Sequence, residues 1–275
     1  MADDFTPLRV VVLTSRSAPG LAQLLADPNR GTVYELTAVV SSEPSFTEMK
    51  AVEEAGVSVL LRPMREFFAE HHLSLRNLQD RTGYDEQLAG LARDLQADYL
   101  VLDGYNYIVS APLLEEFPMR ILALHDGDLT LRDEEGRRRY AGLHAVRDAL
   151  FDGEFETRSS AFFVTAEVGE GPLFLLSGPF PVPALGVDAR NAGDAATLSS
   201  YAELHRRWMV GHTWGRMLTR GLEFLAAGSV QVIHDLVWID GVPGPCRMGD
   251  SPSLCQKLKP LIDSRIPSSC PLIKD

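Results

Sequence analysis

Cysteine is scarce in this chain of 275 residues, and the three cysteines present all lie close to its end. Cys246, Cys255 and Cys270 leave the first 245 residues without a thiol. Their spacing matches no tetrahedral zinc site, and three ligands would leave such a site one short. We therefore predict no metal site and interpret the cysteines as thiols of a C-terminal tail. A disulfide, or a metal site shared between subunits, is the alternative.

Long apolar runs and excess positive charge are also missing. No stretch of 18 apolar residues occurs, so no transmembrane helix is predicted. The net charge of −12 argues against a nucleic-acid or anionic-membrane binder. Residues 137–139 form one local arginine run, for which we expect a solvated loop, with an anion contact as the alternative. The acidic N-terminus leads directly into a strand, which predicts no signal peptide and a cytoplasmic location.

Apolar runs of strand length alternate with helical segments through the first half of the chain. This alternation predicts an α/β fold with a mostly parallel, doubly wound sheet. The expected strands are 8–13, 34–40, 57–61, 99–102 and 120–124, and the expected helices are 21–26, 47–55, 86–96 and 112–117.

The second half is less regular. We expect a helix over 142–151, a hairpin of strands 159–165 and 173–177, and a final hairpin of 230–233 and 236–239 closed by Asp240-Gly241. A long helical stretch over 195–226 can be broken at Gly211, Gly215 and Gly221. Residues 1–245 are expected to form one domain, and 246–275 an irregular tail rich in Pro, Ser and Cys.

Two short segments suggest a functional site. The apolar run 121–124 delivers His125 at its end, and VGEGP at 168–172 reads as a tight glycine-rich turn after a strand. A buried strand that ends in a titratable residue is a common way to build a catalytic floor in an α/β protein.

These segments resemble the phosphoribosylglycinamide formyltransferase family. ADYLVLDGYNYIVS at 97–110 and YAGLHAVRDAL at 140–150 extend the resemblance, which runs in order from about residue 8 to about residue 245. It implies a formyltransferase-like fold and transfer of a formyl group from 10-formyltetrahydrofolate to a small-molecule amine. The chain departs from the family pattern at two positions. Ala123 stands where the family has an asparagine, and Gly169 where it has an aspartate.

The resemblance also implies catalytic roles. His125 is expected to act in acid/base chemistry and to face the developing oxyanion, with a structural histidine as the alternative. Glu170 is the expected replacement for the missing aspartate, and Glu167, Asp126 and Asp128 are alternatives. His144 aligns with another polar residue near the family's site, although on a helix it could equally be a surface residue.

Ligand contacts follow from the same resemblance. The folate pocket is expected at Tyr107, Ile108 and Val109 and at the main chain of Val168 and Gly169. The phosphate-binding turn of the family matches Ser15, Arg16 and Ser17. Here Arg16 and Ala18 replace glycines of that turn and Pro19 removes a backbone donor, so a close backbone phosphate cradle is not expected. Arg16 is expected either to hold an anion or to face solvent.

Two classes of function remain open. The first is a divergent folate-dependent one-carbon transferase acting on an amine other than glycinamide ribonucleotide, because the loop after His125 is longer and more charged than in the family. The second is a catalytically silent family member that binds a ligand or a partner. Other acyl or carbamoyl chemistry on the same sheet is a third possibility. The protein is expected to be a monomer or a homodimer.

Overall fold

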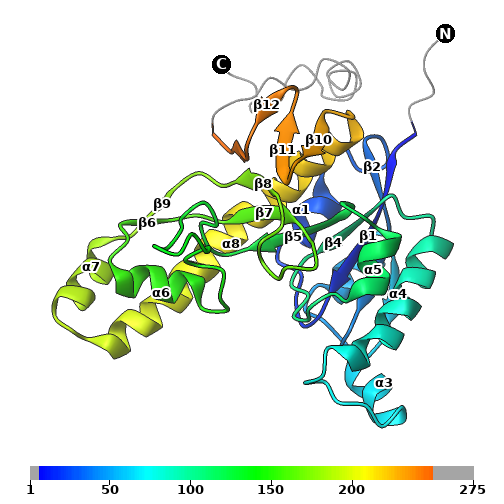
Figure 1. Cartoon of the computed structure of the whole chain (residues 1–275), viewed down its shortest axis with the longest axis horizontal. Helices are drawn as coiled ribbons and strands as arrows, with labels where there is room; N and C mark the ends of the chain where they lie inside the picture. The colour runs from blue at the N-terminus through cyan, green and yellow to red at the C-terminus, as the bar shows by residue number, and fades with distance from the viewer. Residues whose placement is uncertain (1–5, 250–275) are drawn as a thin grey trace.

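The computed structural model describes residues 6–249, and a single twisted sheet forms its centre (Figure 1). Eight strands pair in the order β13-β8-β7-β5-β4-β1-β2-β3. Strands β1 to β5 are parallel, whereas β7 is antiparallel to β5 and β8 is antiparallel to β7. The strands are β1 (Leu8–Thr14), β2 (Tyr34–Ser41), β3 (Ser58–Leu61), β4 (Tyr99–Leu102), β5 (Ile121–His125), β7 (Ser160–Phe163), β8 (Leu173–Leu176) and β13 (Cys246–Arg247). The predicted doubly wound, mostly parallel sheet is confirmed.

Helices cover both faces of the sheet because the central strands are apolar on both sides. In β1, Val10 and Val12 pack in one core cluster, and Val11 and Leu13 in another. The first face carries α1 (Leu21–Ala26), α2 (Met49–Glu54) and the C-terminal half of α8 (Ala195–Ala226). The second face carries α3 (Met64–Glu70), the short 3-10 helix η1 (Gln79–Arg81), α4 (Thr82–Asp94) and α5 (Ala111–Glu116).

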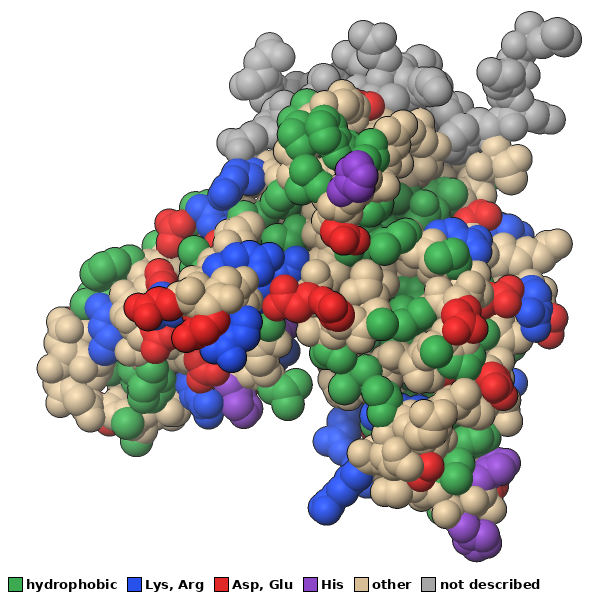
Figure 2. Space-filling model, in the orientation of Figure 1, with side chains coloured by type: hydrophobic (Ala, Val, Ile, Leu, Met, Phe, Trp, Pro, Cys, Tyr) green, Lys and Arg blue, Asp and Glu red, His purple; other side chains and the backbone are tan. Residues whose placement is uncertain are grey.

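An arm projects from the sheet, on the left in Figure 1. It consists of α6 (Ala145–Asp152), α7 (Ala184–Asn191), the N-terminal half of α8, and a two-stranded ribbon of β6 (Glu156–Thr157) and β9 (Phe180–Pro181). Its own small apolar core includes Val146, Leu150, Leu198 and Met209. Acidic and basic side chains are intermingled over the arm in Figure 2, which also shows the molecule hollowed between the arm and the α3–α5 side.

The predicted breaks in the long helix are wrong, because α8 runs for 32 residues without interruption. Two of its glycines instead allow close packing. A Cβ at Gly215 would lie 2.5 Å from the Cβ of Gln23 in α1, and one at Gly221 would lie 3.0 Å from the ring of Phe174. Tertiary packing against the sheet therefore outweighs the weak helix propensity of glycine.

The C-terminal strands differ from prediction in detail. The expected hairpin is present as β10 (Val230–Ile233) and β11 (Leu236–Ile239), but His234 and Asp235 close it, both at positive φ. Asp240 and Gly241 instead connect β11 to a further strand, β12 (Val242–Pro243). Residues 246–247, expected to be irregular, form β13 and pair with β8. Cys255 and Cys270 lie outside the described residues.

Within residues 6–249, no helix combines the length and the apolar character needed to cross a bilayer. The same residues contain no cluster of three or more His, Cys, Asp or Glu side chains that could hold a metal ion.

Candidate active site

A cavity of about 310 Å³ lies at the carboxyl ends of the parallel strands. The chain winds outward from β1 to β3 and then returns to β4 on the other side of β1. The loops after β1 and β4 therefore leave in opposite directions, and ligands of open α/β sheets bind in the crevice at such a point. Residues that follow β1, β4 and β5 all line the cavity.

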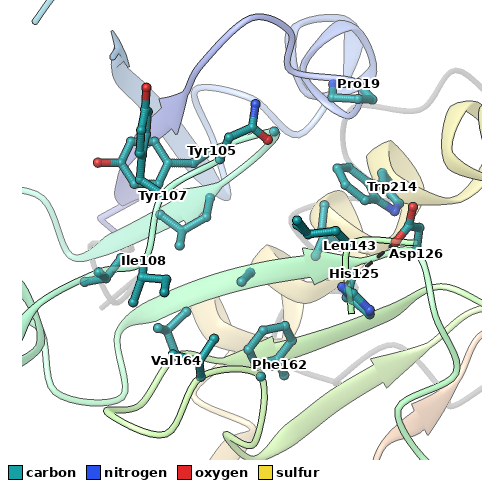
Figure 3. A pocket seen from close by; sticks show the side chains of 18 of the residues that line it. Pro19, Tyr105, Tyr107, Ile108, His125, Asp126, Leu143, Phe162, Val164 and Trp214 are labelled. Carbon is teal, nitrogen blue, oxygen red and sulfur yellow. Dashed lines mark ion pairs between the residues drawn. The ribbon is translucent and has the colours of Figure 1, made fainter. Parts of the chain in front are cut away.

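The cavity has an apolar end and a polar end (Figure 3). Tyr105, Tyr107, Ile108, Phe162 and Val164 line the apolar end. The polar end is lined by His125, Asp126 and Trp214, beside Pro19. Arg206 also lines the cavity and contacts Asp126. Exposed apolar side chains border the cavity, notably Leu143 at 93% and Val168 at 63% exposure. Large exposed apolar residues around a cavity are typical of a ligand-binding site.

His125 lies at the end of β5, in the wall of this cavity. Its Nε2 lies 2.7 Å from the carbonyl oxygen of Tyr140. Because a carbonyl only accepts hydrogen bonds, Nε2 carries the hydrogen in this arrangement. Nδ1 is then the nitrogen available to a ligand, and it lies 3.9 Å from Oδ1 of Asp126.

Asp126 is the carboxylate beside the histidine. Its side chain is buried, and its Oδ2 accepts a hydrogen bond from Nε of Arg206 on α8. A buried carboxylate requires such compensation. The cavity thus contains a histidine, a carboxylate and a guanidinium in one chain of contacts.

Neither of the two positions that depart from the family pattern carries a hydrogen-bonding side chain. Ala123, two residues before His125 on β5, lines the cavity with a methyl group. Gly169 presents only backbone. The indole of Trp214, however, is 5% exposed, and its Nε1–H is buried without a hydrogen-bond partner in the described part of the chain. A buried donor without a partner calls for an explanation, and a bound ligand that reaches it would provide one.

Glu170 does not approach His125. Its Oε2 lies 3.5 Å from Nε of Arg138 and 3.6 Å from Nη1 of Arg132. The carboxylate therefore faces the charged loop that follows β5. Asp126, one of the alternatives to Glu170, lies beside the histidine instead.

His144 is exposed at the N-terminal end of α6 and does not line the cavity of His125. It borders a neighbouring hollow of about 290 Å³ together with Arg147, Glu203 and Arg206.

The turn after β1 is filled by the chain's own side chains. Ser15 is buried, and its Oγ bonds with Oγ of Ser42 and accepts the backbone N–H of Asn106. Ser17 lines the cavity, whereas Arg16 is exposed over a separate hollow. The predicted binding residues Ser15, Arg16 and Ser17 therefore point in different directions.

Two carboxylates occupy the backbone donors of the same turn. Glu48 accepts the N–H of Ala18 at 2.8 Å, and Asp103 accepts the N–H of Gly20 at 2.9 Å. Burial raises the pKa of Asp103 to about 7. No exposed backbone cradle is left at Ala18 and Gly20.

The loop after β4 forms one wall of the cavity. Tyr107, Ile108 and Val109 all line the cavity, as the resemblance implies. The buried Arg81 supports them from behind. Its Nη1 donates to the carbonyl of Ile108 at 2.6 Å, and its guanidinium carbon lies 5.0 Å from the centre of the Tyr107 ring.

The turn after β7 forms the facing wall, and Val168 and Gly169 line the cavity there. Gly171 permits the turn to close, because a Cβ at this position would lie 1.8 Å from the carbonyl oxygen of Phe163.

Sequence reasoning missed Arg206 and Trp214. They lie eight residues apart on α8, a spacing that brings them to similar sides of the helix. No motif marks them, since their role depends on how α8 crosses the end of β5.

The sequence is similar to those of known formyl transferases. Residues 8–183 match the family model described as formyl transferase. Phosphoribosylglycinamide formyltransferase of Escherichia coli (strain K12) is 25% identical over 238 residues, which cover 85% of this chain and 94% of that protein. Methionyl-tRNA formyltransferase of Trichodesmium erythraeum is 24% identical over 161 residues, covering 58% of this chain and 42% of that protein.

Solved structures show the same fold. Glycinamide ribonucleotide transformylase 1 from Symbiobacterium toebii superposes with a TM-score of 0.67 at 26% identity, covering 85% of this chain and 94% of that one. A formyltetrahydrofolate deformylase from Pseudomonas putida KT2440 gives a TM-score of 0.60 at 15% identity, covering 85% and 70%. With the family model spanning both the His125 strand and the glycine turn, the chain belongs to the formyl transferase family.

Proposed function

We propose that this protein is a folate-dependent formyl transferase whose acceptor is an amine other than glycinamide ribonucleotide. The observation that carries the proposal is the position of His125. It stands at the strand end that faces the cavity, with Nδ1 directed away from its backbone anchor and 3.9 Å from a carboxylate oxygen.

The lining of the cavity supports 10-formyltetrahydrofolate as the proposed donor. Its apolar end, with Tyr105, Tyr107 and Phe162, suits a flat heteroaromatic ring. Residues 105–109, 168 and 169 also line the cavity, and their main-chain groups can form hydrogen bonds whatever the side chains are. The polar end would then face the formyl group, where His125 and Trp214 are the donors.

When bound, the donor supplies an electrophilic formyl carbon that the acceptor nitrogen attacks. His125 is the proposed catalytic residue. In its protonated form Nδ1–H faces the oxygen on which negative charge develops, and in its neutral form Nδ1 accepts a proton from the acceptor nitrogen. Asp126 would stabilise positive charge on the ring, and Arg206 holds Asp126 in place.

The same site can also support binding without turnover. Ala123 provides no hydrogen bond, and losing one oxyanion donor typically lowers kcat by ~10²–10³. The indole N–H of Trp214 is the group in the cavity wall best suited to compensate. A silent, ligand-binding family member is therefore the second candidate.

The turn after β1 supports the acceptor proposal. A phosphate placed there would meet the carboxylates of Glu48 and Asp103 in place of free N–H groups. We therefore propose an acceptor without a phosphate group at this subsite. Glycinamide ribonucleotide carries one, so it should be a poor substrate.

The test is transfer of a ¹³C-labelled formyl group from 10-formyltetrahydrofolate to a panel of amines, with matched members that carry or lack a phosphate. We expect transfer to a phosphate-free amine and a loss of ~10²–10⁴ in rate for His125→Asn. Donor binding without transfer to any amine would favour the silent candidate. Efficient transfer to glycinamide ribonucleotide would contradict the proposed acceptor.

A further inference from the structure

We propose that Arg138, in the charged loop 126–140, is a positioning residue that holds the cavity wall at 168–171 in its binding conformation. The proposal rests on the proposed function only for the identity of the ligand that the wall contacts. The sequence suggested a solvated arginine run at this point, and the structure directs its middle member inward.

Arg138 is the buried member of the run. It is 8% exposed, whereas the side chain of its neighbour Arg137 is 72% exposed. Nη1 of Arg138 donates to the carbonyl of Gly169, and Nη2 donates to the carbonyl of Gly171 at 2.7 Å. One guanidinium thus holds two carbonyls of the same turn. The rigid fork of arginine makes such paired contacts, which a lysine cannot reproduce.

Glu170 explains how this buried charge is tolerated. Glu170 lies between Gly169 and Gly171 in the sequence. Its Oε2 is 3.5 Å from Nε of Arg138 and 3.6 Å from Nη1 of Arg132. Glu170 also accepts the backbone N–H of Arg138 at 3.4 Å. The turn therefore carries the counter-ion of the arginine that holds it, which is a different task from orienting His125.

The turn depends on this support because few backbone bonds fix it. The N–H of Phe163 bonds with the carbonyl of Pro172 at the base, and Glu170 N–H bonds with the carbonyl of Glu167 inside the turn. Gly169 adopts a φ of +73°, and Val168 is exposed. Without Arg138, two carbonyls beside the cavity would lose their donors.

The supporting loop is itself ordered by hydrogen bonds. Asp133 N–H donates to the carbonyl of Arg137, and Arg139 N–H donates to the carbonyl of Leu131, so residues 131–139 fold back on themselves. The loop ends at Tyr140, whose carbonyl anchors Nε2 of His125. One loop therefore fixes both the histidine and the facing wall of the cavity.

The test compares Arg138→Gln with the control Arg137→Gln, which removes an exposed arginine paired with Asp133 and Glu135. Amide hydrogen exchange of the peptide covering 166–172 is measured in the unliganded protein. Exchange in R138Q should be roughly tenfold faster there, while R137Q should match the wild type. R138Q should also weaken binding of a stable 10-formylfolate analogue with less effect on kcat.

Two further variants keep the test decisive. If R138Q does not fold, Arg138→Lys is used, which can bond with one carbonyl at a time and should give intermediate exchange. Glu170→Gln keeps both arginine–carbonyl bonds and should change exchange less than R138Q. Unchanged exchange in R138Q, or in R138K where only that variant folds, would overturn the proposal. Because exchange needs no ligand, a wild type that binds no folate would defeat the proposed function alone.

Discussion

The two walls of the cavity are each held by a buried arginine, but the arginines come from different kinds of segment. Arg81, which supports the wall at 105–109, precedes α4, one of the helices that cover the sheet. Arg138, which supports the wall at 168–171, belongs to the charged loop after β5. Both bond with main-chain carbonyls. Side chains in the walls can therefore vary while the backbone that a ligand meets stays in place.

The two walls differ in the kind of segment that supports them. The first wall rests on an element that the alternating sheet itself requires. The second rests on the charged loop 126–140, which the sequence predicts to differ from the family pattern. We infer that one wall of the proposed folate site is supported by a helix-bearing segment of the common fold, and the other by the charged loop.

The largest expected effect is a loss of stability when one glycine in each wall is replaced. A Cβ at Gly104 would lie 1.8 Å from the carbonyl oxygen of Ser17, and one at Gly171 would lie 1.8 Å from that of Phe163. Gly104→Ala and Gly171→Ala should each lower the free energy of unfolding by about 3 kcal/mol or more, because backbone must move. Urea denaturation measures the loss.

Gly136→Ala is the control for these two variants. Gly136 also has a positive φ, +81°, but a Cβ there would meet nothing within 4 Å. Gly136→Ala should lower the free energy of unfolding by only ~1–2 kcal/mol, which is the cost of a left-handed backbone for a residue with a Cβ. Equal losses in all three variants would show that close approach does not determine the walls.

The next effect separates the two arginines. Arg81→Gln removes the donor to Ile108 and the contact with Tyr107, so it should destabilise the protein by about 2 kcal/mol. It should also weaken binding of a stable 10-formylfolate analogue, measured by titration calorimetry. Arg93→Gln, an exposed arginine on α4 paired with Glu116, is the control and should stay within ~0.5 kcal/mol of the wild type. A wild-type affinity in R81Q would remove Arg81 from the account of the first wall.

A pH-dependent effect is expected at Asp103, which directly precedes Gly104. Burial raises the pKa of Asp103 to about 7, well above the usual range of an aspartate, so the folded protein keeps a proton that the unfolded chain has already released. Stability should therefore fall as pH rises from about 4 to about 7, by up to ~1.4 kcal/mol per pH unit, and level off above it. Asp103→Asn should remove this part of the slope. Parallel stability curves for the two proteins from pH 5 to pH 8 would contradict the assignment.

The smallest effect is expected at the polar end between the walls. Trp214→Phe removes the unpaired N–H while keeping an aromatic ring, and should reduce ligand binding or transfer by about fivefold. Trp238→Phe is matched, because its Nε1 is also buried and unpaired among the described residues, but it lies on β11 and does not line the cavity. Equal ligand affinities in the two variants would exclude Trp214 as a ligand donor.

Much of the central sheet could be predicted from sequence, because a buried parallel strand is a short apolar run rich in β-branched residues. The run over 8–13 and the histidine at the end of 121–124 needed only apolar length and β-branched residues. The helix α3 was missed, although Met64, Phe67 and Phe68 have helical spacing.

The remaining site depends on contacts that no local pattern encodes. Arg137 and Arg138 are identical in sequence terms, and only the fold of the loop decides which one is buried. Likewise, the choice between Glu170 and Asp126 as neighbour of His125 depends on the direction of side chains in irregular backbone. Arg206 reaches the cavity through the path of α8, and it lies 80 residues after Asp126, which it contacts.

The central claim is that a formylated folate binds between the two walls with His125 at its reacting end. The direct measurement is a titration of ¹⁵N-labelled protein with a stable 10-formylfolate analogue, followed by NMR at the amides of Ile108 and Gly169 and at the imidazole of His125. The account predicts saturable shifts at all three positions with one affinity. No binding, or shifts confined to residues outside the cavity, would contradict it.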